Sequence, residues 1–351
     1  MNLKTMMAGS LALAMLGCSK TEDFDKKATD AELARKPGGG GGGSSISLGI
    51  VGDAADVSTP TTGGTLLMGG STDVDNAMKW MITKAGGGDI VVIRASGTNA
   101  YNSYIYGFGT CNSVETLLID SRTDANSTEA ETKIRNAEAV FIAGGDQWNY
   151  VNYWKDTKVE DALNYLRNTK GCVIGGTSAG CAIQGNYYFT AQNGTVYSDE
   201  MLANPYNQYA TIGVGGFLSN PYLGNLITDT HFNNPDRKGR LLGFLARMSK
   251  DNGIVPKGVG VEERTAVCID ADGSSKVFGS NSAYFMIGEN GVPETCVSGS
   301  KLTWNRSAQA VKVYKVSGTT GGTNTFNFSS WSGTGGTSQF YYADNGTLKF
   351  N

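Results

Sequence analysis

The sequence predicts an α/β fold built on a doubly wound, mostly parallel sheet, followed by a β-rich C-terminal portion. Short apolar runs alternate with helical stretches, and pairs of glycines follow several of the apolar runs. Beyond about residue 265 the pattern changes to short strands separated by Gly, Asn and Ser turns. Buried apolar strands that alternate with helices are typical of a parallel sheet with right-handed crossovers.

The alternation of strands and helices begins at about residue 46. Val74, Ala77, Met78 and Met81 share one face of the first predicted helix. In such folds, functional groups gather at the carboxyl ends of the strands, where the glycine pairs lie. We expect strands at 65–68, 89–93, 114–119, 139–143 and 171–174, and helices at 73–84, from about 120 to 136, and at 159–168.

The C-terminal third contains short predicted strands without the intervening helices. Its expected strands are 267–269, 282–287, 311–316 and 325–328. We therefore expect a domain over residues 46–328, and a β-rich or loose tail over 329–351 that is rich in Ser, Gly, Thr and aromatic residues.

The first residues are typical of a targeting segment. A basic residue, Lys4, precedes a short apolar stretch that is too short to span a bilayer comfortably. The stretch ends in Leu16-Gly17-Cys18, which resembles the lipobox of bacterial lipoproteins, although a plain signal peptide would share most of these features. We expect a signal peptide and lipidated Cys18 over residues 1–18, a flexible tether over 19–45, and a lipid-anchored protein of the Gram-negative cell envelope, periplasmic or on the outer-membrane surface.

Composition argues against other classes of protein. The formal net charge is -3, whereas a dedicated nucleic-acid binder normally carries a basic excess. Of the six cysteines, the five beyond Cys18 are an odd number, so they cannot all pair with one another. No Cys/His cluster has the spacing of metal ligands, and we expect neither a metal nor a cofactor.

The segment Gly176–Gly180 matches the G-x-S-x-G nucleophile elbow, with Ser178 as the candidate nucleophile. Only small flanking residues allow the cramped strand-to-helix turn of this motif to close. Because the chain contains 49 glycines, the match alone is weak, and a glycine-rich packing turn is the alternative. Its position supports function, since it follows a predicted buried strand and opens a helical segment.

His231 is the only histidine in the chain, so an imidazole general base must be this residue. A lone histidine is often structural. However, His231 follows the partly apolar run 223–227, which we expect to form a strand. Ser178 and His231 are therefore both predicted at carboxyl ends of strands.

A serine–histidine pair needs a third group that holds the imidazole tautomer. Glu262 and Glu263 end another apolar run, and side chains of neighbouring strand residues point to opposite faces, so only one of them can face His231. Asp229 is a further candidate, and paired acids in a solvated loop are the alternative.

Four segments in this order resemble the signature blocks of cyanophycinases, which belong to a serine peptidase family that also contains aspartyl dipeptidases. The resemblance covers roughly residues 60 to 320. The segments are Phe141–Gln147, Gly176–Gly180, Asp229–Phe232 with Arg237 and Gly239–Leu241, and Gly258–Ala266.

The resemblance implies a fold like that of class I glutamine amidotransferases, with serine in place of their cysteine. It implies a triad of Ser178, His231 and Glu263, and an oxyanion hole made by the amide groups of Ala179 and Gly145. It also suggests a homodimer. Amide donors aimed at a developing oxyanion contribute several kcal/mol in sites of this kind, on the order of 3 to 4 kcal/mol per donor.

Further positions are implied to line the substrate pocket: Asp146, Gln147, Thr230, Arg237 and Arg240. Two departures from the family pattern bear on the substrate. Thr230 stands where the family carries glutamine, and Pro235 stands where the first of three arginines is expected. Proline cannot replace the hydrogen-bonded ion pair that arginine forms with a carboxylate.

We therefore expect a serine-type exopeptidase that hydrolyses short or isopeptide-linked peptides, such as cyanophycin-like β-aspartyl-arginine or related Asp-containing peptides. An aspartyl or isoaspartyl dipeptidase of the same family is one alternative. A non-catalytic surface lipoprotein that binds peptides or glycans is another, because a fold alone does not determine function. The aromatic residues of the tail motivate that alternative: Phe328, Trp331, Phe340, Tyr341 and Tyr342.

Overall fold

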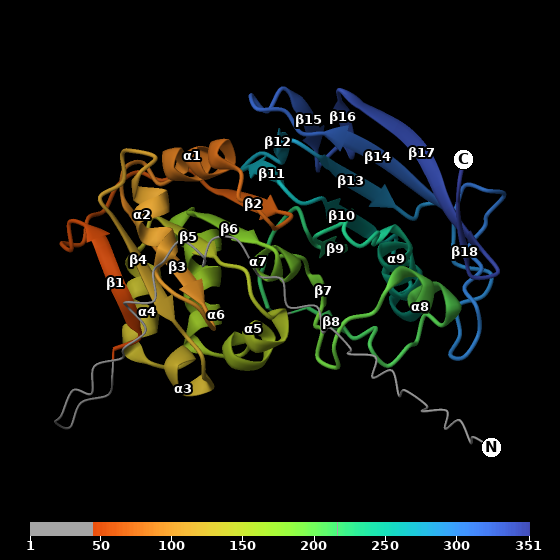
Figure 1. Cartoon of the computed structure of the whole chain (residues 1–351), viewed down its shortest axis with the longest axis horizontal. Coiled ribbons are helices and arrows are strands. Elements are labelled where there is room, and N and C mark those ends of the chain that lie inside the picture. Colours follow the sequence, from red (N-terminus) through yellow and green to blue (C-terminus); the bar gives the residue numbers. More distant parts are fainter. Residues whose placement is uncertain (1–44, 216) are drawn as a thin grey trace, which may run out of the picture.

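The computed structural model describes residues 45–215 and 217–351, which form two β-sheets with helices packed against them (Figure 1). The expected signal peptide with Cys18, and all but the last residue of the expected tether, lie outside the described residues. Within the described ranges, no helix combines the length and the apolar composition that a bilayer crossing requires.

The first sheet has ten strands and carries the α/β part of the fold. Its central strands β4, β3, β5, β6 and β2 are parallel to one another, while the strands on both sides of them pair antiparallel. In spatial order the sheet contains β1 (Ser47–Gly52), β4 (Ser113–Leu118), β3 (Asp89–Arg94), β5 (Ala139–Ile142), β6 (Val173–Thr177), β2 (Gly64–Met68), β11 (Thr265–Asp270), β12 (Ser274–Gly279), β15 (Asn324–Asn327) and β16 (Ser332–Thr334).

Helices cover both faces of the parallel strands, which confirms the predicted α/β class. All six residues of β3 are buried, because Ile90 and Val92 pack toward one helical layer and Val91 and Ile93 toward the other. The first layer contains α1 (Asp75–Lys84) and α2 (Ala100–Tyr106), and the second contains α3 (Arg122–Ala125), α4 (Thr128–Asn136), α5 (Gln147–Trp154) and α6 (Lys158–Tyr165).

The second sheet has eight strands. Strand β9 is parallel to its neighbours β7 and β10, and the remaining pairs are antiparallel. In spatial order it contains β18 (Thr347–Phe350), β17 (Gly336–Asp344), β14 (Val311–Ser317), β13 (Ser282–Ile287), β10 (Lys257–Val261), β9 (Leu226–Asp229), β7 (Tyr187–Phe189) and β8 (Ile212–Val214), and the helices α8 (Ser198–Ala203) and α9 (Lys238–Asn252) pack on it.

A hydrophobic core joins the two sheets. Leu67 and Phe326 of the first sheet share it with Val259 and Phe285 of the second, and the rings of Phe285 and Phe326 stack with centroids 3.8 Å apart. This packing brings the end of β6 in the first sheet close to the ends of β9 and β10 in the second, around α7 (Ala179–Ala182) near the middle of Figure 1.

Residues 329–351 contain strands that belong to both sheets. Strand β16 pairs with β15, and β17 pairs with β14, so main-chain hydrogen bonds connect this segment to the domain. Phe328 and Tyr341 are buried, and Trp331 packs edge-on against Phe328. These aromatic rings therefore contribute to packing, which weakens the argument that the tail binds a ligand.

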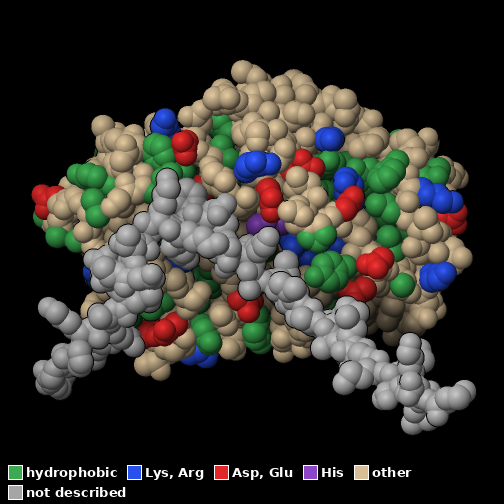
Figure 2. All heavy atoms as spheres, in the orientation of Figure 1, with side chains coloured by type: hydrophobic (Ala, Val, Ile, Leu, Met, Phe, Trp, Pro, Cys, Tyr) green, Lys and Arg blue, Asp and Glu red, His purple; other side chains and the backbone are tan. Residues whose placement is uncertain are grey.

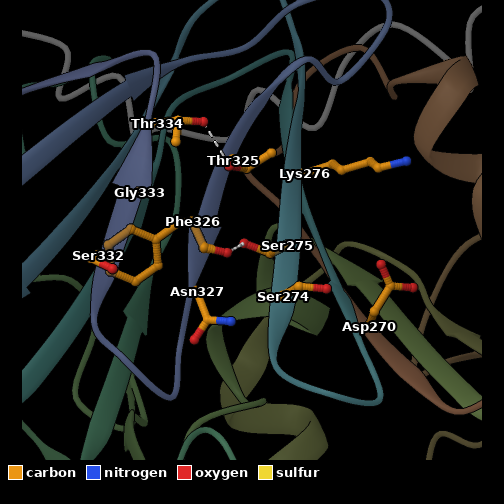
Figure 3. Close-up of a pocket in the computed structure, with 10 residues that line it drawn as sticks. All are labelled: Asp270, Ser274, Ser275, Lys276, Thr325, Phe326, Asn327, Ser332, Gly333 and Thr334. Atoms are coloured by element: carbon orange, nitrogen blue, oxygen red, sulfur yellow. Dashed lines mark hydrogen bonds between the residues drawn. The ribbon is translucent and has the colours of Figure 1, made fainter.

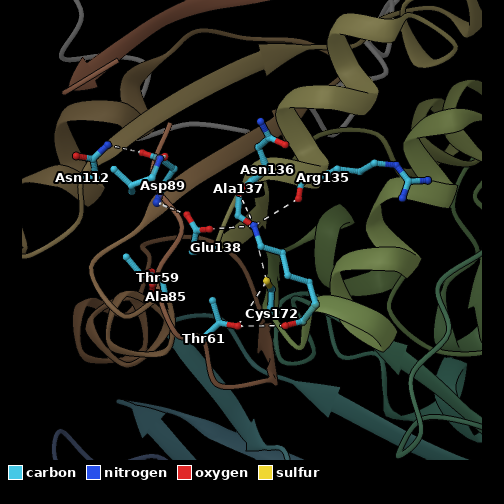
Figure 4. Close-up of polar contacts among 12 residues, drawn as sticks. Thr59, Thr61, Ala85, Asp89, Asn112, Arg135, Asn136, Ala137, Glu138 and Cys172 are labelled. Carbon is cyan, nitrogen blue, oxygen red and sulfur yellow. Dashed lines mark hydrogen bonds and ion pairs between the residues drawn. The ribbon is translucent and has the colours of Figure 1, made fainter. Parts of the chain in front are cut away.

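A polar network closes the amino ends of the parallel strands, opposite the end where function was expected (Figure 4). The fully buried carboxylate of Glu138 accepts a hydrogen bond from the amide of Asp89 at 2.8 Å and pairs with Lys170 Nζ at 2.9 Å. Lys170 also donates to the carbonyl oxygen of Ala137 at 2.9 Å. This network links the starts of β3, β5 and β6, so we assign it to stability.

Candidate active site

The site lies where strands of both sheets end. Ser178 follows β6 of the first sheet, His231 follows β9 of the second, and Glu263 follows β10, the parallel neighbour of β9. Figure 2 shows the purple imidazole of the only histidine in the middle of one face of the molecule, with acidic and basic side chains nearby. The structure thus brings together three residues that lie far apart in the sequence.

Ser178 occupies a sharp turn between β6 and α7. Its backbone has φ 51° and ψ −117°, a conformation that costs a non-glycine residue about 1–3 kcal/mol. The turn is closely packed: a Cβ atom on Gly176 would lie 2.3 Å from the carbonyl oxygen of Gly180, and one on Gly180 would lie 2.2 Å from that of Ile142. The two glycines of the motif are therefore required by the packing of the turn.

A continuous chain of hydrogen bonds connects the three side chains. Ser178 Oγ lies 2.8 Å from His231 Nε2, and His231 Nδ1 lies 2.8 Å from Glu263 Oε1. The backbone amide of His231 donates to the carbonyl oxygen of Gly69 at 2.8 Å, which holds the backbone from which the imidazole extends. The side chains of His231 and Glu263 are 23% and 19% exposed, so the chain of bonds is open to a ligand at its edge.

Of the three acids that the sequence left open, only Glu263 contacts the imidazole. Glu262 points the other way, where its carboxylate accepts hydrogen bonds from the Tyr284 hydroxyl at 3.0 Å and the Ser282 amide at 2.8 Å. The carboxylate of Asp229 is buried and pairs with Arg240. The two glutamates therefore point in different directions, as predicted, although both lie beyond the end of β10 at Val261.

The electrostatics of the site favour a neutral imidazole. Burial lowers the pKa of His231 below its ordinary value of 6.5, and the nearby charge of Arg237 acts in the same direction. The hydrogen bond that the imidazole donates to Glu263 raises this pKa but does not outweigh burial. A neutral imidazole whose Nδ1–H is held by Glu263 presents the lone pair of Nε2 to the Ser178 hydroxyl.

The two expected oxyanion donors flank Ser178. Ala179 is the first residue of α7, and Gly145 lies in the turn between β5 and α5. A Cβ atom on Gly144, the residue before Gly145, would lie 3.5 Å from Ser178 Cβ. Within residues 45–215 and 217–351, neither the Ala179 nor the Gly145 amide has a hydrogen-bond acceptor.

The expected substrate positions fall into different environments. Asp146 is exposed and caps α5 by accepting a hydrogen bond from the Trp148 amide at 2.9 Å. Gln147 is half-buried and its amide lies 3.4 Å from the Phe189 carbonyl oxygen. Thr230 is buried beside His231.

The two expected arginines differ most clearly. Arg237 is half-buried, donates to the Thr230 carbonyl oxygen at 2.8 Å, and lies close enough to His231 to lower its pKa. Arg240 is only 3% exposed, and its guanidinium binds both carboxylate oxygens of Asp229. The expectation that Arg240 contacts substrate is therefore corrected: its donors are used inside the protein, where it supports the strand that leads to His231.

A buried carboxyl group that the sequence pattern did not indicate lies behind Ser178. Asp73 follows the Gly69-Gly70 pair, is almost fully buried, and accepts a hydrogen bond from the Tyr101 hydroxyl at 2.7 Å. Burial raises its pKa to about 6. The hydroxyl of Thr177 opposes this shift, although the two groups do not meet hydrogen-bond geometry. Its place after a strand-end glycine pair was the available signal.

A separate hollow of about 350 Å³ lies on β12, β15 and β16 and is lined mainly by hydroxyl and amide side chains (Figure 3). None of the site residues lines it, so it is not the candidate active site. In the part of the chain that the structure describes, no group of three or more His, Cys, Asp or Glu side chains could hold a metal ion. The five described cysteines are free thiols.

A family model and several curated relatives match this chain. A model of peptidase family S51 matches residues 65–277, more than half of the chain. A cyanophycinase from Synechococcus elongatus is 26% identical over 169 residues, which is 48% of this chain and 48% of the relative. A cyanophycinase from Nostoc sp. is 27% identical over 169 residues, which is 48% of this chain and 51% of the relative. This chain thus spans about half the length of the curated relatives that it matches.

Two solved structures are also similar. A peptidase from an acI-B1 Actinobacterium has 15% sequence identity and a TM-score of 0.47, over 64% of this chain and 91% of that one. A putative peptidase E protein from Listeria monocytogenes EGD-e has 16% identity and a TM-score of 0.41, over 62% of this chain and 99% of that one.

Proposed function

This chain belongs to peptidase family S51, and from this premise we propose that it is a serine-type peptidase that cleaves short or isopeptide-linked peptides through an acyl-enzyme. One observation carries the proposal: Ser178, His231 and Glu263 form an unbroken hydrogen-bonded chain with 2.8 Å at each link. This arrangement of hydroxyl, imidazole and carboxylate activates a serine for nucleophilic attack.

In the acylation half-reaction, Ser178 Oγ attacks the carbonyl carbon of the scissile amide while His231 Nε2 takes the hydroxyl proton. The amide groups of Ala179 and Gly145 donate to the oxyanion that forms. His231 then delivers its proton to the leaving nitrogen, the C–N bond breaks, and Ser178 holds the acyl group as an ester. Glu263 keeps the imidazole in the required tautomer and stabilises its charged form.

Deacylation repeats these steps with water. His231 takes a proton from the water as its oxygen attacks the ester carbonyl, and then returns a proton to Ser178 Oγ as the ester bond breaks. The products are a carboxylic acid and the free enzyme. The lowered pKa of His231 supports this role, because the imidazole must be neutral when each half-reaction begins.

For the substrate, we propose peptides with an aspartyl residue at the cleaved bond. The curated relatives are named cyanophycinase, and the cationic Arg237 beside His231 supports recognition of a carboxylate. Pro235 and Thr230, in place of an expected arginine and glutamine, favour smaller aspartyl or isoaspartyl peptides over cyanophycin itself. An exopeptidase that releases dipeptides fits this class.

The test combines a fluorophosphonate probe with a panel of substrates. The wild type should be labelled and should release product from at least one member of a panel of cyanophycin and α- and β-aspartyl peptides, with products identified by mass spectrometry. Ser178→Ala should lose both activities, while Ser280→Ala, at an exposed serine, should keep both. A wild type that is neither labelled nor active would refute the proposal and favour a binding lipoprotein.

We further propose that Cys18 carries a lipid that anchors the enzyme in the cell envelope, and that the enzyme acts as a homodimer. The Leu16-Gly17-Cys18 sequence supports the anchor. Metabolic labelling with an alkyne fatty acid should mark the wild type but not Cys18→Ala, and equal labelling of both would contradict the anchor. Light scattering of the protein without residues 1–18 should give twice the chain mass, and a monomer mass would contradict the dimer.

A further inference from the structure

The turn that contains Gly144 and Gly145 is held from behind by one phenol. Tyr150 lies in α5, one turn after the helix begins, and only 1% of its surface is exposed. Its hydroxyl donates toward the carbonyl oxygens of Gly144, at 2.8 Å, and Ala143, at 3.0 Å. A Cβ atom on Gly145 would lie 2.7 Å from the same hydroxyl, so this oxygen lies close to Gly145 as well.

The anchored carbonyl belongs to the same peptide unit as the expected oxyanion donor. The Gly144 carbonyl and the Gly145 amide are linked by one planar trans bond, so the C=O and N–H groups point in opposite directions. A hydrogen bond that fixes the Gly144 carbonyl toward Tyr150 therefore fixes the Gly145 N–H away from Tyr150. The turn lies against the nucleophile, because a Cβ on Gly144 would be 3.5 Å from Ser178 Cβ.

Tyr150 is itself immobilised. Its ring stacks on that of Trp154, with centroids 4.2 Å apart and an interplanar angle of 10°. The Trp154 ring is fully buried, and its Nε1–H donates to the Ile119 carbonyl oxygen at 2.9 Å. Burial also raises the pKa of Tyr150, so the phenol stays protonated and remains a donor at any pH at which the protein would be assayed.

We propose that Tyr150 is a positioning residue for the oxyanion hole, which acts by holding the Gly144–Gly145 peptide so that the Gly145 N–H faces the acyl carbonyl on Ser178. The inference rests on the proposed peptidase function. A preorganised donor stabilises the oxyanion because it does not have to reorient during the reaction. Without the phenol hydroxyl, the peptide can rotate and the donor is lost for part of the time.

The variant that tests this is Tyr150→Phe, which removes one oxygen and keeps the ring. Tyr188→Phe is the matched control, since Tyr188 is a buried tyrosine of the same hydrophobic core and, among the described residues, its hydroxyl makes no hydrogen bond to the turn. We expect Tyr150→Phe to lower kcat roughly tenfold or more, which is a smaller loss than deleting a donor outright would cause. KM should change less than about twofold. The affinity for an aspartyl peptide aldehyde, whose adduct with Ser178 carries an oxyanion, should fall by the same factor as kcat.

A purely structural role would give a different pattern. If Tyr150→Phe and Tyr188→Phe have equal kcat and equal aldehyde affinity, or if the loss in Tyr150→Phe appears in KM with unchanged aldehyde affinity, the inference is wrong. The acidic limb of the pH profile should not move, because His231 is untouched. If the wild type itself is neither labelled nor active, the proposed function fails and this inference fails with it. If the wild type is active and Tyr150→Phe has the same kcat, only the inference about Tyr150 is wrong.

Discussion

A Cβ atom on Gly70 would lie 2.5 Å from both Nε2 and Cε1 of His231, so the position of the imidazole depends on the absence of a side chain at residue 70. Gly70 also has φ +101°, a conformation that L-residues rarely adopt. Gly70 ends the glycine pair after β2, and His231 follows β9 of the other sheet. The glycine thus allows the two sheets to meet at the nucleophile.

We predict that Gly70→Ala displaces the imidazole and lowers kcat/KM by roughly 100-fold or more, as expected when a general base loses its reach to the nucleophile. Gly171→Ala is the control, because Gly171 also has positive φ, +73°, but a Cβ there would meet nothing within 4 Å. The control should lose only about 1–2 kcal/mol of stability from backbone strain and keep its activity. Equal activity of the two variants, measured on the preferred aspartyl peptide, would contradict this prediction.

Glu263 and Glu262 offer a comparison between neighbours. Glu263→Gln should lower kcat roughly 10³- to 10⁴-fold while leaving the fold intact, because an amide cannot stabilise the imidazolium or enforce its tautomer. Glu262→Gln should leave kcat within a few-fold and cost about 1 kcal/mol of unfolding free energy, since the Glu262 carboxylate, among the described residues, accepts hydrogen bonds from Tyr284 and Ser282 and not from His231. Kinetics and urea unfolding of both variants check this, and a larger loss of kcat in Glu262→Gln would reverse the assignment.

The acidic limb of the pH profile of kcat/KM should lie below pH 6.5, because burial lowers the pKa of His231 and the enzyme loses activity only when the imidazole becomes protonated. Arg237 lowers this pKa and Glu263 raises it. Arg237→Met should therefore move the limb to higher pH, and the residual activity of Glu263→Gln should show it at lower pH. The same profile should be measured in Asp73→Asn, because Asp73 also titrates near pH 6 and this variant removes its contribution to the limb. Shifts in the opposite directions would contradict the assignment of the limb to His231.

Asp73 should make stability depend on pH. Its pKa is raised from 3.8 to about 6 in the folded protein, so the folded state binds the proton more tightly than the unfolded state. The stability that protonation of Asp73 provides is fully present below about pH 4 and is lost as the pH rises toward 6. Above about pH 6, Asp73 no longer makes the free energy of unfolding depend on pH. Relative to Asp73→Asn, the free energy of unfolding of the wild type should fall by about 2–3 kcal/mol between pH 4 and pH 7.

Urea unfolding at several pH values measures this difference. Asp56→Asn, which changes an exposed carboxyl group that does not act on Asp73, is the control and should follow the wild type. A wild type that runs parallel to Asp73→Asn across this range would show that Asp73 does not retain its proton.

Lys170 tests the network at the opposite edge of the sheet. Lys170→Met leaves the carboxylate of Glu138 buried without its cation, which should cost about 3 kcal/mol or more of unfolding free energy. The double variant with Glu138→Gln should recover part of that loss, because the uncompensated charge is removed. Both variants should keep wild-type kcat at temperatures where they are folded, and an unchanged midpoint in Lys170→Met would show that the ion pair contributes nothing.

Much of the site could be predicted because its residues follow predictable local elements. The buried run that became β6 ends one residue before Ser178, and the run that became β10 ends shortly before Glu263. Only one of Glu262 and Glu263 contacts His231, as predicted, although both residues lie just beyond β10 and not within a strand. The role of Arg240 was not predictable, because a charged residue in a sequence carries no sign of whether its partner is a substrate or, as here, Asp229.

The sequence by itself determined the α/β class, the positions of most buried strands, and the short list of residues that could provide a nucleophile, a base and an acid. These depend on local hydrophobic periodicity, on glycine at tight turns and on the presence of only one histidine. The tertiary structure alone decided that Ser178 follows a strand of one sheet and His231 and Glu263 follow strands of the other, and that Asp73 and Tyr150 lie behind Ser178. Sheet membership and burial arise from pairing and packing between segments that are distant in the sequence, and no local pattern records which segments will meet.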